Sequence, residues 1–161
     1  MSLAIVPGSF DPMTMGHLEL VRKAAKRYDE VVVAVMINSS KRYLFDLETR
    51  LEIARLTVSN EKNVRVIADR GLLIDLYDRM RANAVCKGFR NLTDYEYEMH
   101  MADWNRDHNP RFRTELMYSH GPYETLSSTE VREMLGKGIV PEAQVHPNAL
   151  PLILTKLKKE L

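Results

Sequence analysis

The run from Val31 to Ile37 constrains the fold most, because seven consecutive apolar residues, four of them valine, lie between polar neighbours. A short run rich in β-branched residues is typical of a strand that is buried on both faces. Similar but shorter runs occur at Leu3 to Val6, Val64 to Ile67, Ala84 to Lys87 and Thr114 to Ser119. A sheet buried on both faces needs helices to cover it, and the segments between these runs supply them.

Apolar residues recur at helical spacing between the strand-like runs. The expected helices cover residues 18–28, 46–58, 73–81, 93–105 and 127–135, and a last segment has Leu150, Ile153, Leu157 and Leu161 in helical register. Five alternations of strand and helix predict an α/β fold: a Rossmann-like five-stranded parallel sheet with helices on both faces. We expect one domain over residues 1–161, with C-terminal helices.

Local signals refine the fourth and fifth helices. Thr93 is expected to cap the fourth helix, and Ser127 or Ser128 the fifth. Tyr95 and Tyr97 are expected to be packing groups, and Tyr97 shares one helical stripe with Met101 and Trp104. Glycines 136 and 138 end the fifth helix.

Charge and cysteine content exclude several classes of protein. The chain has 23 basic and 22 acidic residues, so nucleic-acid binding through bulk charge is not expected. The lone cysteine, Cys86, cannot form an internal disulfide, which favours a cytoplasmic location. No apolar run approaches 18 residues, and the N-terminal residues do not resemble a secretory signal, so no membrane partner is expected.

The first candidate piece of a site is the stretch GSFDPMTMGH, which joins the first strand to the first helix at Gly16 and His17. Amide groups at a helix start attract phosphate, and a histidine there can donate to an oxygen that gains negative charge. A capped helix with a solvent-facing histidine explains the same residues equally well. Ligands of parallel sheets bind beyond the carboxyl ends of the strands, where this loop lies.

Three further segments follow the second, fourth and fifth strands. Lys41 is placed to bind a substrate phosphate, or belongs to an ordinary polar loop. Lys87 and Arg90 flank a turn at Gly88 and suit a polyphosphate. Asp94 and Glu98 follow on one helix face, where solvated carboxylates are also common, and the stretch TLSSTEVRE places three hydroxyls at a helix start that needs one. Together, at one sheet edge, these segments indicate an enzyme that handles phosphates.

The same motifs resemble those of a known enzyme family. Thr14 and Gly16-His17 are similar to the (H/T)-x-G-H motif of the nucleotidyltransferase superfamily, and SSTEVR resembles its second signature. Lys41 and KGFRNLTDYEYEM resemble bacterial phosphopantetheine adenylyltransferases. Over essentially the whole chain, the resemblance implies AMP transfer from ATP to 4′-phosphopantetheine, which gives dephospho-coenzyme A and pyrophosphate. It also implies Mg²⁺ arriving with ATP, a homohexamer, and regulation by coenzyme A.

The resemblance assigns roles position by position. It implies catalytic roles for His17, Lys41 and Arg90, and contacts of the acceptor substrate with Ser9, Lys41, Leu73 and Lys87. The ATP contacts that it implies are Ser9, Phe10, His17, Gly88, Phe89, Arg90, Glu98, Tyr123, Glu124, Thr125, Leu126, Ser127, Ser128 and Thr129. No standing metal site is expected, because no carboxylates cluster in the motifs. Two positions depart from the family: Lys87 replaces an arginine, and Ser9 replaces a threonine.

Other functions share some of these features. Nicotinamide mononucleotide adenylyltransferases and glycerol phosphate cytidylyltransferases have the first and last motifs, but Lys41 and DYEYEM count against both. A redox dinucleotide-binding domain is disfavoured because the first loop lacks G-x-G-x-x-G and no acidic residue ends the second strand. Class I aminoacyl-tRNA synthetases share the histidine signature, but are much longer and have a second, lysine-rich motif. A nucleotide-binding module without activity stays open, although the intact His17, Lys41 and Arg90 count against it.

Overall fold

A five-stranded parallel sheet forms the centre of the protein, as predicted. The computed structural model describes residues 1–119 and 121–160, so Leu161 of the expected C-terminal stripe lies outside the described residues. The strands are β1 (Leu3–Gly8), β2 (Glu30–Met36), β3 (Val64–Asp69), β4 (Ala84–Phe89) and β5 (Thr114–Tyr118). Their order is β3-β2-β1-β4-β5, so the winding direction reverses between β1 and β4.

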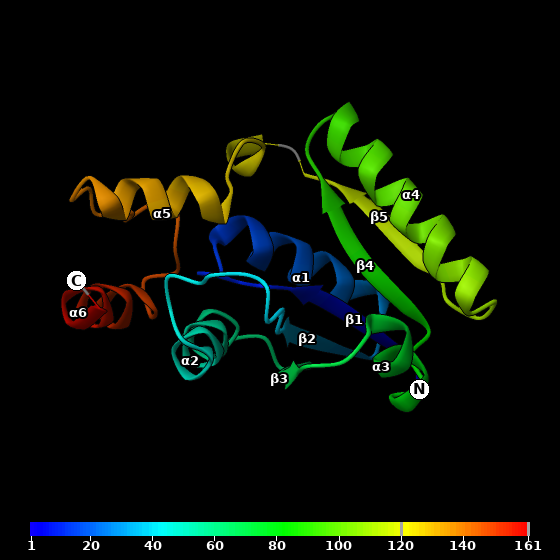
Figure 1. Ribbon diagram of the computed structural model, residues 1–161. Coiled ribbons are helices and arrows are strands. Elements are labelled where there is room, and N and C mark those ends of the chain that lie inside the picture. The colour runs from blue at the N-terminus through cyan, green and yellow to red at the C-terminus, as the bar shows by residue number, and fades with distance from the viewer. Residues whose placement is uncertain (120, 161) are drawn as a thin grey trace.

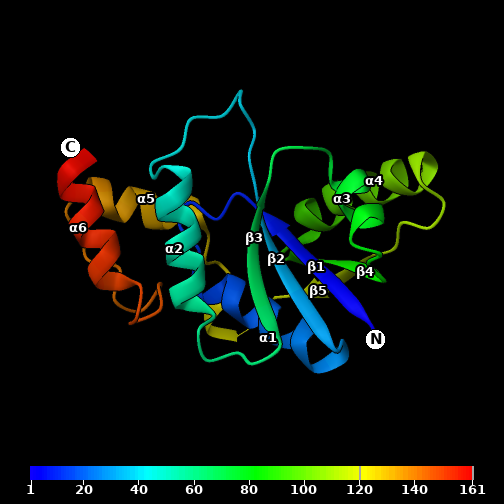
Figure 2. The ribbon, with the colours of Figure 1, turned by 90° about the horizontal axis from the view of Figure 1, so that it is seen from below.

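Helices cover both faces of this sheet (Figures 1 and 2). They are α1 (Met15–Arg27), α2 (Leu47–Thr57), α3 (Leu73–Arg79), α4 (Leu92–His108), α5 (Ser128–Gly136) and α6 (Leu150–Glu160), with a 3₁₀ turn, η1 (Gly121–Tyr123). Figure 2 shows α3 and α4 on one side of the sheet, away from α2, α5 and α6. In the described part of the chain, no helix is both long and apolar enough to cross a membrane.

Alternating strand residues build two hydrophobic cores, one on each face. Val33 and Val35 of β2 belong to the larger core, which also contains Leu18 of α1 and Ile53 of α2. Ala34 points to the opposite face and belongs to the smaller core, with residues of α3. Val31 to Val35 are fully buried, which explains why β2 reads as a continuous apolar run.

The helix starts follow the expected chemistry except at α4. Ser127 caps α5 by accepting a hydrogen bond from the Glu130 amide. The prediction that Thr93 caps the fourth helix is wrong: Asn91 has the extended backbone of a cap, and its Oδ1 accepts from the Asp94 amide at 2.8 Å. The helix therefore starts earlier than expected, and Thr93 lies within its first turn.

The expected packing role of the α4 stripe is also corrected. Tyr97, Met101 and Trp104 are 62%, 40% and 45% exposed, so this stripe faces outward instead of filling the core. Tyr95 does pack, because its ring lies 5.1 Å from that of Phe89. Periodicity alone places residues on one face, but it does not say whether that face is covered.

The C-terminal segment, which contains none of the four motifs, closes the larger core. Ala149 and Ile153 are fully buried in it, next to α2. The backbone amide of Met15, at the start of α1, donates to the carbonyl of Gln144 at 2.8 Å. The C-terminal segment therefore contacts the same loop that leads to His17.

Candidate functional site

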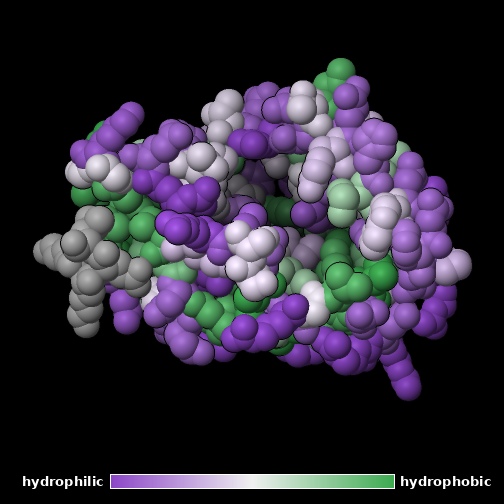
Figure 3. Space-filling view, viewed as in Figure 1, coloured by the Kyte–Doolittle hydropathy of each residue, from purple (hydrophilic) through white to green (hydrophobic). Residues whose placement is uncertain are grey.

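A cavity of about 400 Å³ lies at the carboxyl ends of the strands, at the point between β1 and β4 where the winding direction of the sheet reverses. We call it the site cavity, and Figure 3 shows a hollow on this face with hydrophilic residues around it. The structure brings together many of the predicted site residues in its lining: Ser9, Phe10, His17, Lys41, Lys87, Gly88, Arg90, Glu98, Tyr123, Leu126, Ser127, Ser128 and Thr129. All four motifs therefore meet in one place.

The imidazole of His17 is held in one orientation by the start of α1. The backbone N–H of Thr14 donates to Nδ1 of His17 at 2.9 Å, and the Thr14 hydroxyl accepts from the His17 amide. Because a backbone amide can only donate, Nδ1 must be the unprotonated nitrogen. The neutral ring then carries its proton on Nε2, which can donate within the cavity that His17 lines.

The surroundings of His17 keep this ring neutral. Removal from water, helped by the charges of Lys87 and Arg90, lowers the pKa of His17 to about 4. Phe10 packs edge-on against the ring, with centroids 5.0 Å apart. Phe10 itself has a positive φ of 49° and lies over Gly8, where an added Cβ would come within 2.9 Å of its ring. His17 is thus a neutral hydrogen-bond donor near physiological pH.

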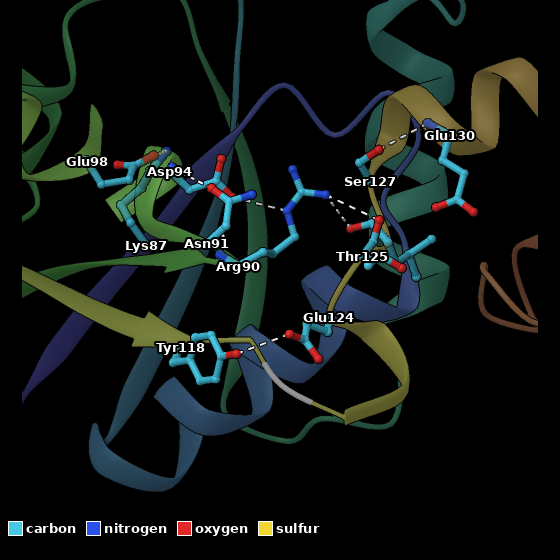
Figure 4. A network of polar contacts seen from close by, with 11 residues as sticks. Lys87, Arg90, Asn91, Asp94, Glu98, Tyr118, Glu124, Thr125, Ser127 and Glu130 are labelled. Atoms are coloured by element: carbon cyan, nitrogen blue, oxygen red, sulfur yellow. Dashed lines mark hydrogen bonds and ion pairs between the residues drawn. The ribbon is translucent and has the colours of Figure 1, made fainter. Parts of the chain in front are cut away.

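Two cations, Lys87 and Arg90, lie at the end of β4 and act electrostatically on His17, and each is paired with a carboxylate of α4 (Figure 4). Lys87 Nζ lies 3.6 Å from Glu98, and Arg90 Nε donates to Asp94 at 3.2 Å. Arg90 also donates to the carbonyl of Thr125 at 3.3 Å, which links α4 to the segment before α5. Asp94 and Glu98 line the cavity and pair with its cations, which favours a role in the site over an ordinary solvated helix face.

The hydroxyls at the start of α5 already have partners. Ser127 caps the helix, Ser128 donates to the carbonyl of Pro12 at 2.8 Å, and Thr129 accepts from Arg132 at 3.0 Å. Two of the three hydroxyls are therefore engaged beyond the cap, and one of them joins α5 to the opening loop. A phosphate entering here would have to share or exchange these hydrogen bonds.

Lys41 lies at the junction with a second cavity of about 610 Å³. Its Nζ donates to Ser9 Oγ at 3.3 Å, and Ser9, Lys41 and Lys87 line both cavities. Leu73 lines this second cavity and not the site cavity. Leu73 also lines an apolar groove of about 580 Å³ between α3 and α4, which includes Met101 and Trp104.

Several predicted nucleotide contacts lie outside the cavity lining. The Phe89 ring packs between Tyr95 and Tyr118, and the Glu124 carboxylate accepts from the hydroxyl of Tyr118. Thr125 approaches the site through its backbone carbonyl. The expected turn at Gly88 is wrong as well, since β4 continues through Phe89 and the turn follows it.

Three buried or cavity-lining residues were not predicted from the sequence. Asp11, 3% exposed, accepts from the amides of Leu44 and Phe45, and Arg132 donates to the Asp11 carbonyl at 2.8 Å. Arg50 is 2% exposed. A signal existed for Arg50, because it lies three residues after Leu47 and four before Ala54, on the apolar stripe of its helix.

Comparisons with known proteins agree with this geometry. The cytidylyltransferase-like family matches residues 5–134. A phosphopantetheine adenylyltransferase of Heliobacterium modesticaldum is 42% identical over 86% of this chain and 82% of its own, and one of Clostridium botulinum is 36% identical over 99% of both.

A solved structure supports the fold independently. It is described as a candidate nicotinate-nucleotide adenylyltransferase from Vibrio parahaemolyticus, and it superposes with a TM-score of 0.74 over 98% of this chain and 94% of its own. At 16% identity this likeness concerns the fold alone. The sequence matches extend over nearly the whole chain and include all four motifs of the site. The chain belongs to the cytidylyltransferase-like family and, within it, to the phosphopantetheine adenylyltransferases.

Proposed function

We propose that this protein transfers the adenylyl group of ATP to 4′-phosphopantetheine, which yields dephospho-coenzyme A and pyrophosphate, the penultimate step of coenzyme A synthesis. The observation that carries the proposal is the neutral His17, whose Nε2–H donor lies in one cavity with Lys41, Lys87 and Arg90. The membership of the chain in the family supports the choice of acceptor.

The chemistry requires positioning more than a base. A phosphate oxygen of phosphopantetheine attacks the α-phosphorus of ATP, and the bond from this phosphorus to pyrophosphate breaks as the new one forms. The attacking oxygen is already an anion near neutral pH, so no side chain has to remove a proton. His17 donates to an oxygen on the α-phosphorus, where negative charge develops, while Lys41 and Arg90 hold the phosphates.

The two cavities suggest how the substrates divide the site. ATP occupies the side formed by Arg90 and the start of α5, and the acceptor occupies the side that contains Leu73. The reacting phosphates then meet at Ser9, Lys41 and Lys87, the polar residues common to both cavities. The apolar groove beyond Leu73 suits the uncharged arm of the acceptor.

Mg²⁺ is proposed to arrive with the ATP phosphates. Among the described residues, no three histidine, cysteine or acidic side chains converge as a metal site, and Asp94 and Glu98 are engaged with cations. Such a site fits an ion that is held mainly by phosphate oxygens and water. When bound, the ion neutralises phosphate charge, and the residues of the chain position the phosphates themselves.

Three further properties complete the proposal. We propose a homohexamer, feedback by coenzyme A, and a cytoplasmic location. The exposed apolar side chains of α4, among them Leu92 at 70% and Tyr97 at 62%, are consistent with burial by another copy of the chain. Light scattering after size-exclusion chromatography measures the oligomeric state, and a coenzyme A titration of the turnover measures feedback.

An acceptor panel tests the proposed reaction. Pyrophosphate release from ATP is measured with phosphopantetheine, nicotinamide mononucleotide and nicotinate mononucleotide, and from CTP with glycerol 3-phosphate. We expect turnover with phosphopantetheine and at least about 10²-fold less with the others, because only this acceptor fills the apolar groove. Preference for another acceptor would refute the proposal, and ATP binding without turnover on any of them would support an inactive nucleotide-binding module.

A further inference from the structure

Arg50 of α2 is a buried cation beside the site. Its side chain is 2% exposed, and no carboxylate among the described residues forms an ion pair with it. Instead, Nη1 donates to the carbonyl of Ser9 at 2.9 Å, Nε donates to the carbonyl of Phe45 at 3.2 Å, and the guanidinium lies 3.8 Å from the centre of the Tyr43 ring. Asp46, at the start of the same helix, interacts with Arg50 electrostatically without forming an ion pair with it. Burying a charge without a directly paired opposite charge is costly, so these contacts must offset a substantial desolvation penalty.

The contacts of Arg50 join two loops that both reach the site. One is the opening loop with Ser9, and the other, residues 37–46, carries Lys41 between β2 and α2. Asp11, in the opening loop, also joins these two loops, but as an acceptor. Its carboxylate accepts from the amides of Leu44 at 2.8 Å and Phe45 at 3.0 Å. Arg50 supplies donors to both loops, and Asp11 supplies acceptors.

Two routes lead from Arg50 to Lys41. Arg50 stacks on Tyr43, whose hydroxyl accepts from the amide of Asn38, and the Asn38 carbonyl accepts from the amide of Lys41. Arg50 also fixes the backbone of Ser9, whose hydroxyl accepts from Lys41 Nζ at 3.3 Å. The base and the tip of the lysine side chain are therefore both linked to one guanidinium.

We propose that Arg50 is a positioning residue, which holds Lys41 at the junction of the two cavities; this role rests on the proposed adenylyl transfer. A lysine side chain is long and flexible, so its charge stays at one point only if the backbone beneath it is fixed. A displacement of about 1 Å in a reacting group can cost about 10²-fold in rate. Arg50 itself lines neither cavity, although it contacts Ser9, which lines both.

A double-mutant cycle of Arg50→Met with Lys41→Ala tests the proposal. Arg50→Met keeps the length of the side chain and removes its charge and donors, and we expect kcat to fall about 10- to 100-fold. If Arg50 acts through Lys41, the double variant is within about threefold of Lys41→Ala, because the lysine is no longer there to be misplaced. The proposal would be overturned if the fold-losses in kcat of the two single variants multiply in the double variant. An unchanged kcat in a folded Arg50→Met protein would also overturn it.

Arg55→Met is the matched control on the same helix. Arg55 is exposed, and its one ion pair within the described part of the chain is with Glu52, at 3.9 Å, so its loss should leave kcat unchanged. If Arg50→Met does not fold, Arg50→Lys enters the cycle, with the same expected non-additivity and the same refutation.

Hydrogen exchange supplies a readout that does not depend on turnover. The amides of Leu44 and Phe45 should exchange at least about tenfold faster in the Arg50 variant and at the wild-type rate in Arg55→Met. Unchanged protection would overturn the positioning role. A wild-type protein inactive with phosphopantetheine would instead refute the proposed function, so the two failures are distinguishable.

Discussion

Replacing His17 by alanine removes the donor on which the proposed mechanism depends. Because the Thr14 N–H donates to Nδ1 at 2.9 Å, the proton of the neutral ring is on Nε2, which becomes the donor. Loss of one hydrogen-bond donor to a developing oxyanion costs about 10²- to 10³-fold in kcat, or about 2.7–4 kcal/mol. Because this contact strengthens only in the transition state, kcat and kcat/KM should fall together.

The same substitution also removes part of the helix cap. Nδ1 of His17 accepts the hydrogen bond of the cap residue, so alanine should lower the free energy of unfolding by about 1 kcal/mol. His17→Asn separates the two effects, since its amide oxygen can accept from Thr14 but its side chain is too short to replace Nε2. We expect His17→Asn to be nearly as stable as the wild type and as slow as His17→Ala.

The assay is pyrophosphate release at saturating ATP and phosphopantetheine, with thermal unfolding measured on the same samples. His108→Ala is a suitable control, because this exposed histidine at the end of α4 lies outside the site cavity. A folded His17→Ala or His17→Asn protein with kcat within threefold of the wild type would refute the reasoning.

Three further predictions follow from the described contacts. The pKa of His17 is lowered from 6.5 to about 4, so between these pH values the folded protein binds fewer protons than the unfolded chain. The free energy of unfolding, measured by urea titration, should therefore fall by about 3 kcal/mol as pH drops through this window. This part of the pH dependence should vanish in His17→Asn. Lys87→Ala should raise the KM for phosphopantetheine about tenfold or more, whereas Lys87→Arg should stay within threefold in the same steady-state assay. Gly8→Ala, whose Cβ would meet the Phe10 ring at 2.9 Å, should destabilise the fold by about 1–3 kcal/mol, while Gly136→Ala, with open space around it, should stabilise it by about 0.5–1 kcal/mol in chemical denaturation.

Each of these predictions has a clear contradicting result. Stability that does not change between pH 6.5 and 4 would mean that His17 is not held neutral. An unchanged KM for Lys87→Ala would remove Lys87 from the acceptor side of the site. Equal effects of the two glycine substitutions would show that the approach of Phe10 to Gly8 does not constrain the loop.

The sheet and the meeting of the four motifs could be predicted from the sequence, because both follow from short-range patterns. A run such as Val31 to Ile37 is typical of a buried strand, and the carboxyl ends of parallel strands meet at one edge. His17 and Lys41 follow two such strands, so their meeting followed from topology.

The details that failed depend on contacts between distant segments. Whether the stripe with Tyr97 is covered depends on what packs against α4, which periodicity does not state. Asn91 and Thr93 are both good caps, and only the path of the chain after β4 decides between them. Arg50 donates to the backbone carbonyl of Ser9, 41 residues away. Every residue has such a carbonyl, so residue types alone could not identify this partner.

The hydrogen bond between Thr14 and His17 has a consequence for how this loop can change over time. The contact that begins α1 also decides which ring nitrogen carries the proton. Stability and reactivity are usually tuned by different atoms, but here a substitution that strengthens the helix start by displacing His17 would remove the donor. Conversely, a protein that lost its activity would still have a reason to keep the histidine. Retention of this residue in a diverged relative would therefore be weak evidence of catalysis, and the cavity cations would be the better guide.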